Sequence, residues 1–307
     1  MLGIQEIASY IPEKRISNYS KKDKFGINDE FIKEKIGVEY VSVKSDSENT
    51  SDLCMEAFRN LQEKVSINKE EIEIIIVVTQ NPDYNLPHTS ALIHGRLDLP
   101  ENCASFDISL GCSGFVYGLS TIESFMKCNN MKTGLLFTSD PYSKVIDPED
   151  KNTSLLFGDA ATVSLISDKP IYTAEAYTFS TNGKSYKDLI CENNTLHMNG
   201  RAVSTFARKQ VPFGITEFLK KNNLNIADID KYLFHQGSKF MVSTLARQLG
   251  IDSSKYVYDI SNYGNTVSSS IPILLEKQIP QTENKLLLAS GFGVGLSWAN
   301  VIIKRVS

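Results

Sequence analysis

The chain has 307 residues, of which 41% are hydrophobic and 22% charged, and its formal net charge at pH 7 is −4. This composition is that of an ordinary globular protein, long enough for one large core or two coupled ones, and it excludes disordered and fibrous classes. The acidic balance argues against nucleic acid as a partner.

Export, membrane insertion and metal binding are not indicated either. Residues 1–18 lack a basic start followed by an apolar run, and no window approaches the roughly 18 apolar residues of a membrane span. The cysteines lack the paired spacing of a zinc site or the density of a disulfide scaffold; they are Cys54, Cys103, Cys112, Cys128 and Cys191. We therefore expect a cytoplasmic, reduced protein with no metal site and no membrane partner.

Apolar strand-like runs alternate with amphipathic helical stretches along the whole chain, which predicts an α/β fold. In the first half the main expected elements are a helix over 52–61, strands over 74–78 and 106–109, a helix after 112 and a strand over 134–138. In the second half they are a helix over 213–219 and strands over 232–234, 258–261 and 286–290.

The two halves repeat each other. Phe106-Asp-Ile-Ser109 matches Tyr258-Asp-Ile-Ser261, the run 134–138 matches 286–290, and both matches are separated by 152 residues. A constant separation over two blocks predicts two structurally similar halves with a boundary between 167 and 175, although two unrelated α/β segments could share such short matches by accident.

Reactive residues follow the repeated strands at corresponding places. Cys112 ends the loop after the first Asp-Ile-Ser, Asn265 ends the loop after the second, and His235 ends the strand 232–234. Because α/β sheets usually bind ligands at such loop ends, the three side chains are expected to face one another across a pseudo-twofold axis.

Cys112 has the setting of a nucleophile. It lies between Gly111 and Gly114 at an expected helix start, where unpaired N–H groups and the helix dipole favour the thiolate. A buried structural cysteine is the alternative for this residue, as a core histidine is for His235 and an ordinary turn for Asn265. The glycine-rich segment 291–298 lacks the spacing of a dinucleotide-binding loop and suits an oxyanion site.

Taken together, these segments resemble the ketoacyl-ACP synthase III family, whose members condense an acyl thioester with malonyl-ACP. The resemblance runs nearly the full length of the chain. The segments that carry it, in the family's order, are 7–12, 81–84, 106–115, 156–160, 198–203, 235–236, 263–266 and 291–295.

The resemblance implies an α/β, thiolase-like fold in which two duplicated βαβ-containing halves form a five-layered αβαβα core. Residues 1–170 would be the half with the nucleophilic cysteine, and residues 171–307 the half with the histidine and the asparagine.

The resemblance also implies the chemistry. Cys112 would carry the acyl group, His235 and Asn265 would hydrogen-bond the carbonyl of a malonyl thioester, and the backbone N–H groups of Cys112 and Val294 would form an oxyanion hole. No metal or redox cofactor is expected. The partners would be an acyl carrier protein, an acyl-CoA or acyl-ACP donor, a malonyl thioester and a second copy of the chain, whose acyl pocket Leu86 would close.

Three departures from the family concern substrate binding. Phe31 and Lys151 stand where the family holds the adenine of CoA between a tryptophan and an arginine, and a lysine cannot stack as a planar guanidinium does. Ser238 replaces the asparagine of the family's His-Gln-Ala-Asn segment. We therefore expect a divergent member, serving a specialised pathway, that prefers an ACP-bound acyl donor. The alternative is that Phe31 and Lys151 still hold the adenine of CoA, one by stacking and the other by charge. Lys239 and Arg247 are the candidates for docking an acidic carrier protein.

Residues that this chain lacks distinguish it from related enzymes. Thiolases use a second cysteine in the C-terminal glycine loop, and elongating synthases use two histidines; this chain has neither. Two alternatives stay open: a cysteine-dependent acyltransferase that makes an ester or amide without decarboxylation, and a non-catalytic partner subunit of a condensing heterodimer.

Overall fold

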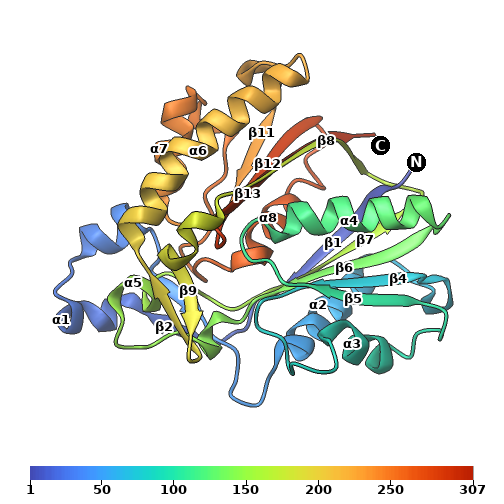
Figure 1. Cartoon of the computed structure of the whole chain (residues 1–307), viewed down its shortest axis with the longest axis horizontal. Coiled ribbons are helices and arrows are strands. Elements are labelled where there is room, and N and C mark those ends of the chain that lie inside the picture. The colour runs from blue at the N-terminus through green and yellow to red at the C-terminus, as the bar shows by residue number, and fades with distance from the viewer. Residues whose placement is uncertain (307) are drawn as a thin grey trace.

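Runs rich in isoleucine, valine and leucine form the strands of one mixed sheet in the computed structural model, which describes residues 1–306 (Figure 1). The strand order is β11-β12-β13-β8-β1-β7-β6-β4-β5. The strands are β1 (Gly3–Tyr10), β4 (Ile74–Val78), β5 (Ala104–Ile108), β6 (Thr133–Ser139), β7 (Ala161–Ser167), β8 (Tyr172–Thr181), β11 (Lys231–Phe234), β12 (Leu286–Gly293) and β13 (Ser297–Arg305). Two small sheets pair β2 (Arg15–Ser17) with β3 (Tyr40–Ser42) and β9 (Leu189–Glu192) with β10 (Thr195–Met198).

The sheet consists of two runs of strands with the same pairing pattern. In the first run β4 pairs parallel to β6, then β6, β7 and β1 pair antiparallel in turn. In the second run β11 pairs parallel to β12, then β12, β13 and β8 pair antiparallel in turn. A single bridge, Ile4 to Tyr172, joins the two runs. The connection between β7 and β8 contains the expected boundary at residue 170, and the division into two domains stays a prediction.

Helices cover both faces of each run. They are α1 (Lys22–Phe25), α2 (Thr50–Lys64), α3 (Thr89–Leu97), α4 (Gly114–Cys128), α5 (Lys151–Ser154), α6 (Gly200–Lys221), α7 (Lys239–Leu249) and α8 (Ser270–Glu276). The short helical turns are η1 (Asn18–Lys21), η2 (Phe31–Ile36), η3 (Lys69–Glu71), η4 (Tyr142–Lys144), η5 (Gly183–Asp188), η6 (Ile226–Asp228), η7 (Ser253–Lys255) and η8 (Val267–Ser269).

The helices and strands stack in five layers (Figure 1). Helices α4 and α8 lie in the middle, because α4 contacts β4 and β6 as well as β12 and β13, and α8 contacts β1 and β7 as well as β11 and β12. Helices α2 and α3 cover the outer face of the first run, and α6 packs on β12 and β13 of the second with α7 beside it. The expected five-layered α/β core with two duplicated halves is confirmed.

The middle layer holds a core shared by both halves. The apolar stripe that the sequence places on α4 is fully buried there; its members are Phe115, Leu119, Ile122 and Met126. They pack with Ile76 and Val78 of β4 and with Leu287 and Val301 of the second half. The start of α4, and with it Cys112, is thus fixed between the two halves. Among residues 1–306, no helix is both long and apolar enough to cross a membrane.

Removing the Phe115 ring should therefore destabilise the whole molecule. We expect Phe115→Ala to lower the free energy of unfolding by about 3–5 kcal/mol, because it leaves a cavity in the shared core. Urea unfolding followed by circular dichroism measures the change.

The matched control is Phe213→Ala on α6, whose side chain is 66% exposed. This control should change the free energy of unfolding by less than about 1 kcal/mol. Equal losses for the two variants would contradict the shared core.

Candidate active site

Cys112 lies between the end of β5 and the start of α4, and only 5% of its surface is exposed. The backbone of β12 passes against it, since a Cβ added to Gly293 would lie 2.6 Å from the Cys112 sulfur. The backbone N–H groups of Val294 and of Cys112 itself lie close enough to the sulfur to lower the pKa of the thiol. The two groups expected to form an oxyanion hole therefore lie at the reactive atom, one from each half of the chain.

His235 follows β11 and is also buried. Its backbone N–H donates to the Ser290 carbonyl at 2.8 Å, which continues the pairing of β11 with β12. Its Nδ1 lies 2.7 Å from Ser270 Oγ, and its ring stands at 89° to that of Phe292, with 5.4 Å between the ring centres. Two neighbours from the second half thus fix the orientation of the imidazole, with Nε2 left for the cavity.

Asn265 presents its amide to the same nitrogen, since Asn265 Nδ2 lies 3.4 Å from His235 Nε2. Its Oδ1 accepts a hydrogen bond from the Val267 N–H at 2.9 Å. Its backbone N–H donates to the Leu156 carbonyl at 2.7 Å, and its carbonyl accepts from the Gly158 N–H at 3.0 Å. A first-half segment therefore holds a second-half residue in place.

Three consecutive buried serines support this arrangement, and the sequence analysis missed them. Ser268 Oγ donates to the carboxylate of Asp140, Ser269 Oγ lies 2.8 Å from Thr138 Oγ1, and Ser270 holds His235. The signal in the sequence is a polar run directly after Asn265 and before an apolar helix. The sequence analysis made no prediction for these three residues, whose hydroxyls are all buried and bonded.

Burial sets the protonation states of the site. It raises the pKa of Cys112 to about 12, an effect that the charge of Asp140 reinforces and the two backbone N–H groups oppose. It also lowers the pKa of His235 to about 3. Burial and the charge of Asp140 therefore oppose the thiolate that the helix start was expected to favour. The resting pair is a thiol and a neutral imidazole.

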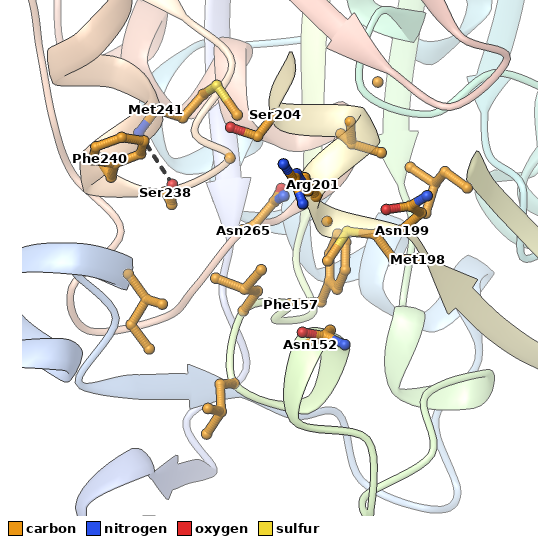
Figure 2. A pocket seen from close by; sticks show the side chains of 18 of the residues that line it. Asn152, Phe157, Met198, Asn199, Arg201, Ser204, Ser238, Phe240, Met241 and Asn265 are labelled. Atoms are coloured by element: carbon orange, nitrogen blue, oxygen red, sulfur yellow. Dashed lines mark hydrogen bonds between the residues drawn. The ribbon is translucent and has the colours of Figure 1, made fainter. Parts of the chain in front are cut away.

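One cavity of about 760 Å³ brings the predicted residues together. Its lining includes Cys112, His235, Asn265, Ser238, Phe31 and Lys151. Figure 2 shows Asn265, Arg201 and Phe157 among the side chains around it. The predicted nucleophile, the two predicted hydrogen-bonding residues and most of the residues expected to bind substrate thus line the same cavity.

Phe31 and Lys151, the two residues expected to hold adenine, contact each other. The Lys151 ammonium lies 5.2 Å from the centre of the Phe31 ring and donates to the Phe25 carbonyl at 3.0 Å. A second ammonium, that of Lys35, lies 5.3 Å from the same ring. An adenine that stacks on Phe31 would have to compete with these cations.

The other predicted residues have simpler surroundings. Ser238 Oγ caps α7 by accepting a hydrogen bond from the Met241 N–H at 3.2 Å (Figure 2). Lys239 and Arg247 both lie on α7, and Lys239 pairs with Glu34 at 2.8 Å. Leu86 is 88% exposed and does not line the cavity of its own chain. The part of the chain that the structure describes contains no group of three or more metal-binding side chains.

Comparisons with known proteins identify the family of the chain. The family described as 3-oxoacyl-[acyl-carrier-protein (ACP)] synthase III matches residues 106–183, and the description of its C-terminal part matches residues 219–305. Beta-ketoacyl-[acyl-carrier-protein] synthase III of Lactococcus lactis subsp. lactis (strain IL1403) is 34% identical over 321 residues, covering 98% of each chain. The enzyme of the same name from Streptococcus pneumoniae (strain Hungary19A-6) is 33% identical with the same coverage.

Solved structures lead to the same result. The crystal structure of 3-oxoacyl-[acyl-carrier-protein] synthase III from Aquifex aeolicus VF5 superposes with a TM-score of 0.92 at 26% identity, covering 99% of this chain and 100% of that one. Full-length similarity in sequence and in fold shows that the chain belongs to the beta-ketoacyl-ACP synthase III family, the thiolase-fold enzymes that transfer acyl groups by condensation.

Proposed function

We propose that the chain transfers an acyl group from a thioester to Cys112 and then condenses it with a malonyl thioester, as a 3-oxoacyl-ACP synthase III. The observation that carries the proposal is the convergence of Cys112, His235 and Asn265 in one cavity. A nucleophile with two adjacent N–H donors suits a reaction that first forms an acyl thioester and then an enolate.

In the first step the sulfur of Cys112 attacks the carbonyl carbon of the acyl donor. The N–H groups of Cys112 and Val294 stabilise the oxygen that becomes negative in the tetrahedral intermediate. The bond to the donor thiol then breaks, and the proton of Cys112 leaves with that thiol. Because the resting thiol is protonated, its proton has to move during this step rather than before it.

In the second step the malonyl thioester loses CO₂, and the electron pair of the broken bond forms an enolate. Ser270 can donate to His235 Nδ1, which leaves the proton of the neutral imidazole on Nε2. Nε2–H and the Asn265 amide are then two donors for the enolate oxygen. The enolate carbon attacks the acyl group, the Cys112 thiolate leaves, and water returns its proton.

For the donor of the first step we propose an ACP-bound acyl group. The two ammonium groups on Phe31 occupy the ring that would hold adenine, and each such contact is worth roughly 0.5–1 kcal/mol. A carrier protein supplies the pantetheine arm without adenine. Its acidic surface would meet Lys239 and Arg247 on α7, the helix whose first turn lines the cavity.

We also propose a homodimer. β5 is the edge strand of the sheet, all of its residues are partly exposed, and Tyr84 and Leu86 project nearby from the loop between β4 and α3. An unpaired edge next to exposed apolar side chains suits association with a second copy. Leu86 would then reach the partner's acyl site.

Variants of the two proposed hydrogen-bond donors, His235 and Asn265, should separate acylation from decarboxylation. We expect His235→Ala and Asn265→Ala to acylate Cys112 but to release CO₂ from a malonyl thioester about 10²–10³-fold more slowly, because each removes one stabilising N–H. Peptide mass spectrometry locates the adduct, and radiolabelled CO₂ gives the second rate.

Cys112→Ala is the control that should lose the adduct altogether. Decarboxylation at wild-type rates in both donor variants would contradict the enolate role and favour the acyltransferase alternative.

The raised pKa of Cys112 predicts a pH dependence. In the empty enzyme the rate of alkylation of Cys112 by iodoacetamide should rise about tenfold per pH unit from pH 7 to pH 9, because only the thiolate reacts. The pKa of Asp140 is raised to about 6, so its carboxylate is charged over this range and disfavours the thiolate. Asp140→Asn should lower the pKa of Cys112 and speed alkylation at pH 8. A plateau below pH 8 in the wild type would show that the helix start outweighs burial.

The donor proposal predicts that one acyl chain acylates Cys112 faster from ACP than from CoA. Lys151→Arg should improve the use of CoA, because a planar guanidinium can stack where an ammonium cannot. Pre-steady-state rates of adduct formation with both donors measure the preference, and Lys187→Arg at a lysine away from the cavity serves as control. A wild-type preference of about tenfold or more for CoA, equivalent to about 1.4 kcal/mol, would overturn the proposal.

A further inference from the structure

A pair of serines joins the two halves directly beside Cys112. Ser113 follows the cysteine, Ser297 is the first residue of β13, and their hydroxyl oxygens lie 2.6 Å apart. Only 1% and 3% of their surfaces are exposed. The two hydroxyls are therefore shielded from water, and each has to find its hydrogen-bond partner within the protein.

The direction of the hydrogen bonds follows from the partners. The Ser297 hydroxyl donates to the Val294 carbonyl at 3.0 Å. Because a hydroxyl has a single proton to donate, Ser297 can only accept from Ser113. A chain of hydrogen bonds thus runs from Ser113 of the first half through Ser297 to the Val294 carbonyl of the second.

Ser113 departs from the usual behaviour of a serine at its place. It is the N-cap residue of α4, where a serine hydroxyl normally accepts a hydrogen bond from a backbone N–H of the first turn. The Ser113 side chain makes no such bond, and its hydroxyl is directed to the other half instead. Local rules of this kind are broken mainly at functional sites, so the missing cap indicates that the contact with Ser297 serves the site.

The turn that contains Val294 is a place where such a contact matters. Residues 294–296 join β12 to β13, and the φ of Gly295 is +134°, in a region that glycine occupies readily because it has no Cβ. A turn built around a glycine is not fixed by its own backbone preferences. The hydrogen bond from Ser297 supplies that restraint at the Val294 carbonyl.

We propose that Ser113 and Ser297 are positioning residues that hold the Val294 N–H beside the Cys112 N–H, so that both donors point at one oxygen. This inference rests on the proposed function, in which the two N–H groups stabilise the oxygen that becomes negative during acyl transfer. Neither serine is among the residues that line the cavity, so both act through Val294 rather than by touching substrate. Small errors in the placement of such donors are costly to the rate.

Alanine variants of the serines should slow acyl transfer and spare decarboxylation. We expect Ser297→Ala to acylate Cys112 about tenfold more slowly at saturating donor, less than the 10²–10³-fold cost of losing a donor, because the Val294 N–H remains but is no longer fixed. The donor is whichever of acetyl-, butyryl- and hexanoyl-ACP acylates the wild type fastest. Release of CO₂ from malonyl-ACP should not change, since that step uses His235 and Asn265 in the proposed function.

A double variant tests whether the serines form one chain. If Ser113 acts through Ser297, Ser113→Ala should lose less than Ser297→Ala, and the double variant should be no slower than Ser297→Ala alone. Losses that multiply in the double variant would overturn the chain. Ser113→Ala is also the milder variant, and it carries the test if Ser297→Ala does not fold.

The reactivity of the thiol gives a readout that needs no acyl donor. The Val294 N–H lowers the pKa of Cys112, so freeing it should raise that pKa. Alkylation by iodoacetamide at pH 8 should then be at least about threefold slower in Ser297→Ala, because only the thiolate reacts. Ser164→Ala is the matched control and should leave all three rates unchanged. Ser164 is fully buried on β7, and its hydroxyl has no hydrogen-bond partner in the part of the chain that the structure describes.

The outcomes separate the two proposals. Acylation and alkylation of Ser297→Ala at wild-type rates, or an equal loss of acylation and decarboxylation, would overturn the positioning role and leave the proposed function standing. No adduct on Cys112 of the wild type with any of the three donors, while the same donors acylate another family member, would overturn the proposed function. The alkylation rates would still decide whether the serines position the Val294 N–H.

Discussion

The site depends on one close contact between the two halves, in which the backbone of β12 at Gly293 passes against the Cys112 sulfur. Any side chain at residue 293 would overlap the sulfur, so the strand can approach only because this residue is a glycine. The approach places the Val294 N–H at the sulfur and the Phe292 ring against His235. Cys112, the Val294 N–H and His235 thus all contact a single stretch of strand.

Close packing of this kind removes water, and the polar groups of the site have to be satisfied by the protein. The serine run 268–270 does this for the second half: one hydroxyl meets Asp140, one meets Thr138 and one meets His235. Burial also favours the neutral forms of Cys112 and His235. Neutral N–H donors need no counter-charge, so they suit a step in which negative charge develops only on the substrate oxygen.

The sequence predicts the parts of this site that depend on topology. Parallel strands end at one edge of a sheet, so Cys112 after β5 and His235 after β11 come together, and their catalytic roles stay predictions. The strand expected over 258–261 is not formed, and Asn265 is instead held by backbone hydrogen bonds to Leu156 and Gly158. Features that depend on tertiary packing could not be predicted. The pKa of Cys112 reflects burial by both halves, the Lys151–Phe31 contact joins segments 120 residues apart, and the Ser113–Ser297 hydrogen bond joins the two halves.

Duplication also explains why the two halves contribute different chemistry from equivalent places. After the first Asp-Ile-Ser the chain enters α4, a helix of 15 residues that begins at Gly114, two residues after Cys112, and the Cys112 N–H lies near its own sulfur. After the second it enters the short turn η8 and then α8, and serine side chains, rather than a long helix start, orient Asn265 and His235. Backbone N–H groups close to the sulfur suit an oxyanion that forms on the carbon bonded to that sulfur. Side chains that project from a loop can instead direct two separate donors at one oxygen of a second substrate. Cys112 of the first half and His235 and Asn265 of the second line the same cavity, so the proposed acyl carrier lies in one space with the two proposed enolate donors.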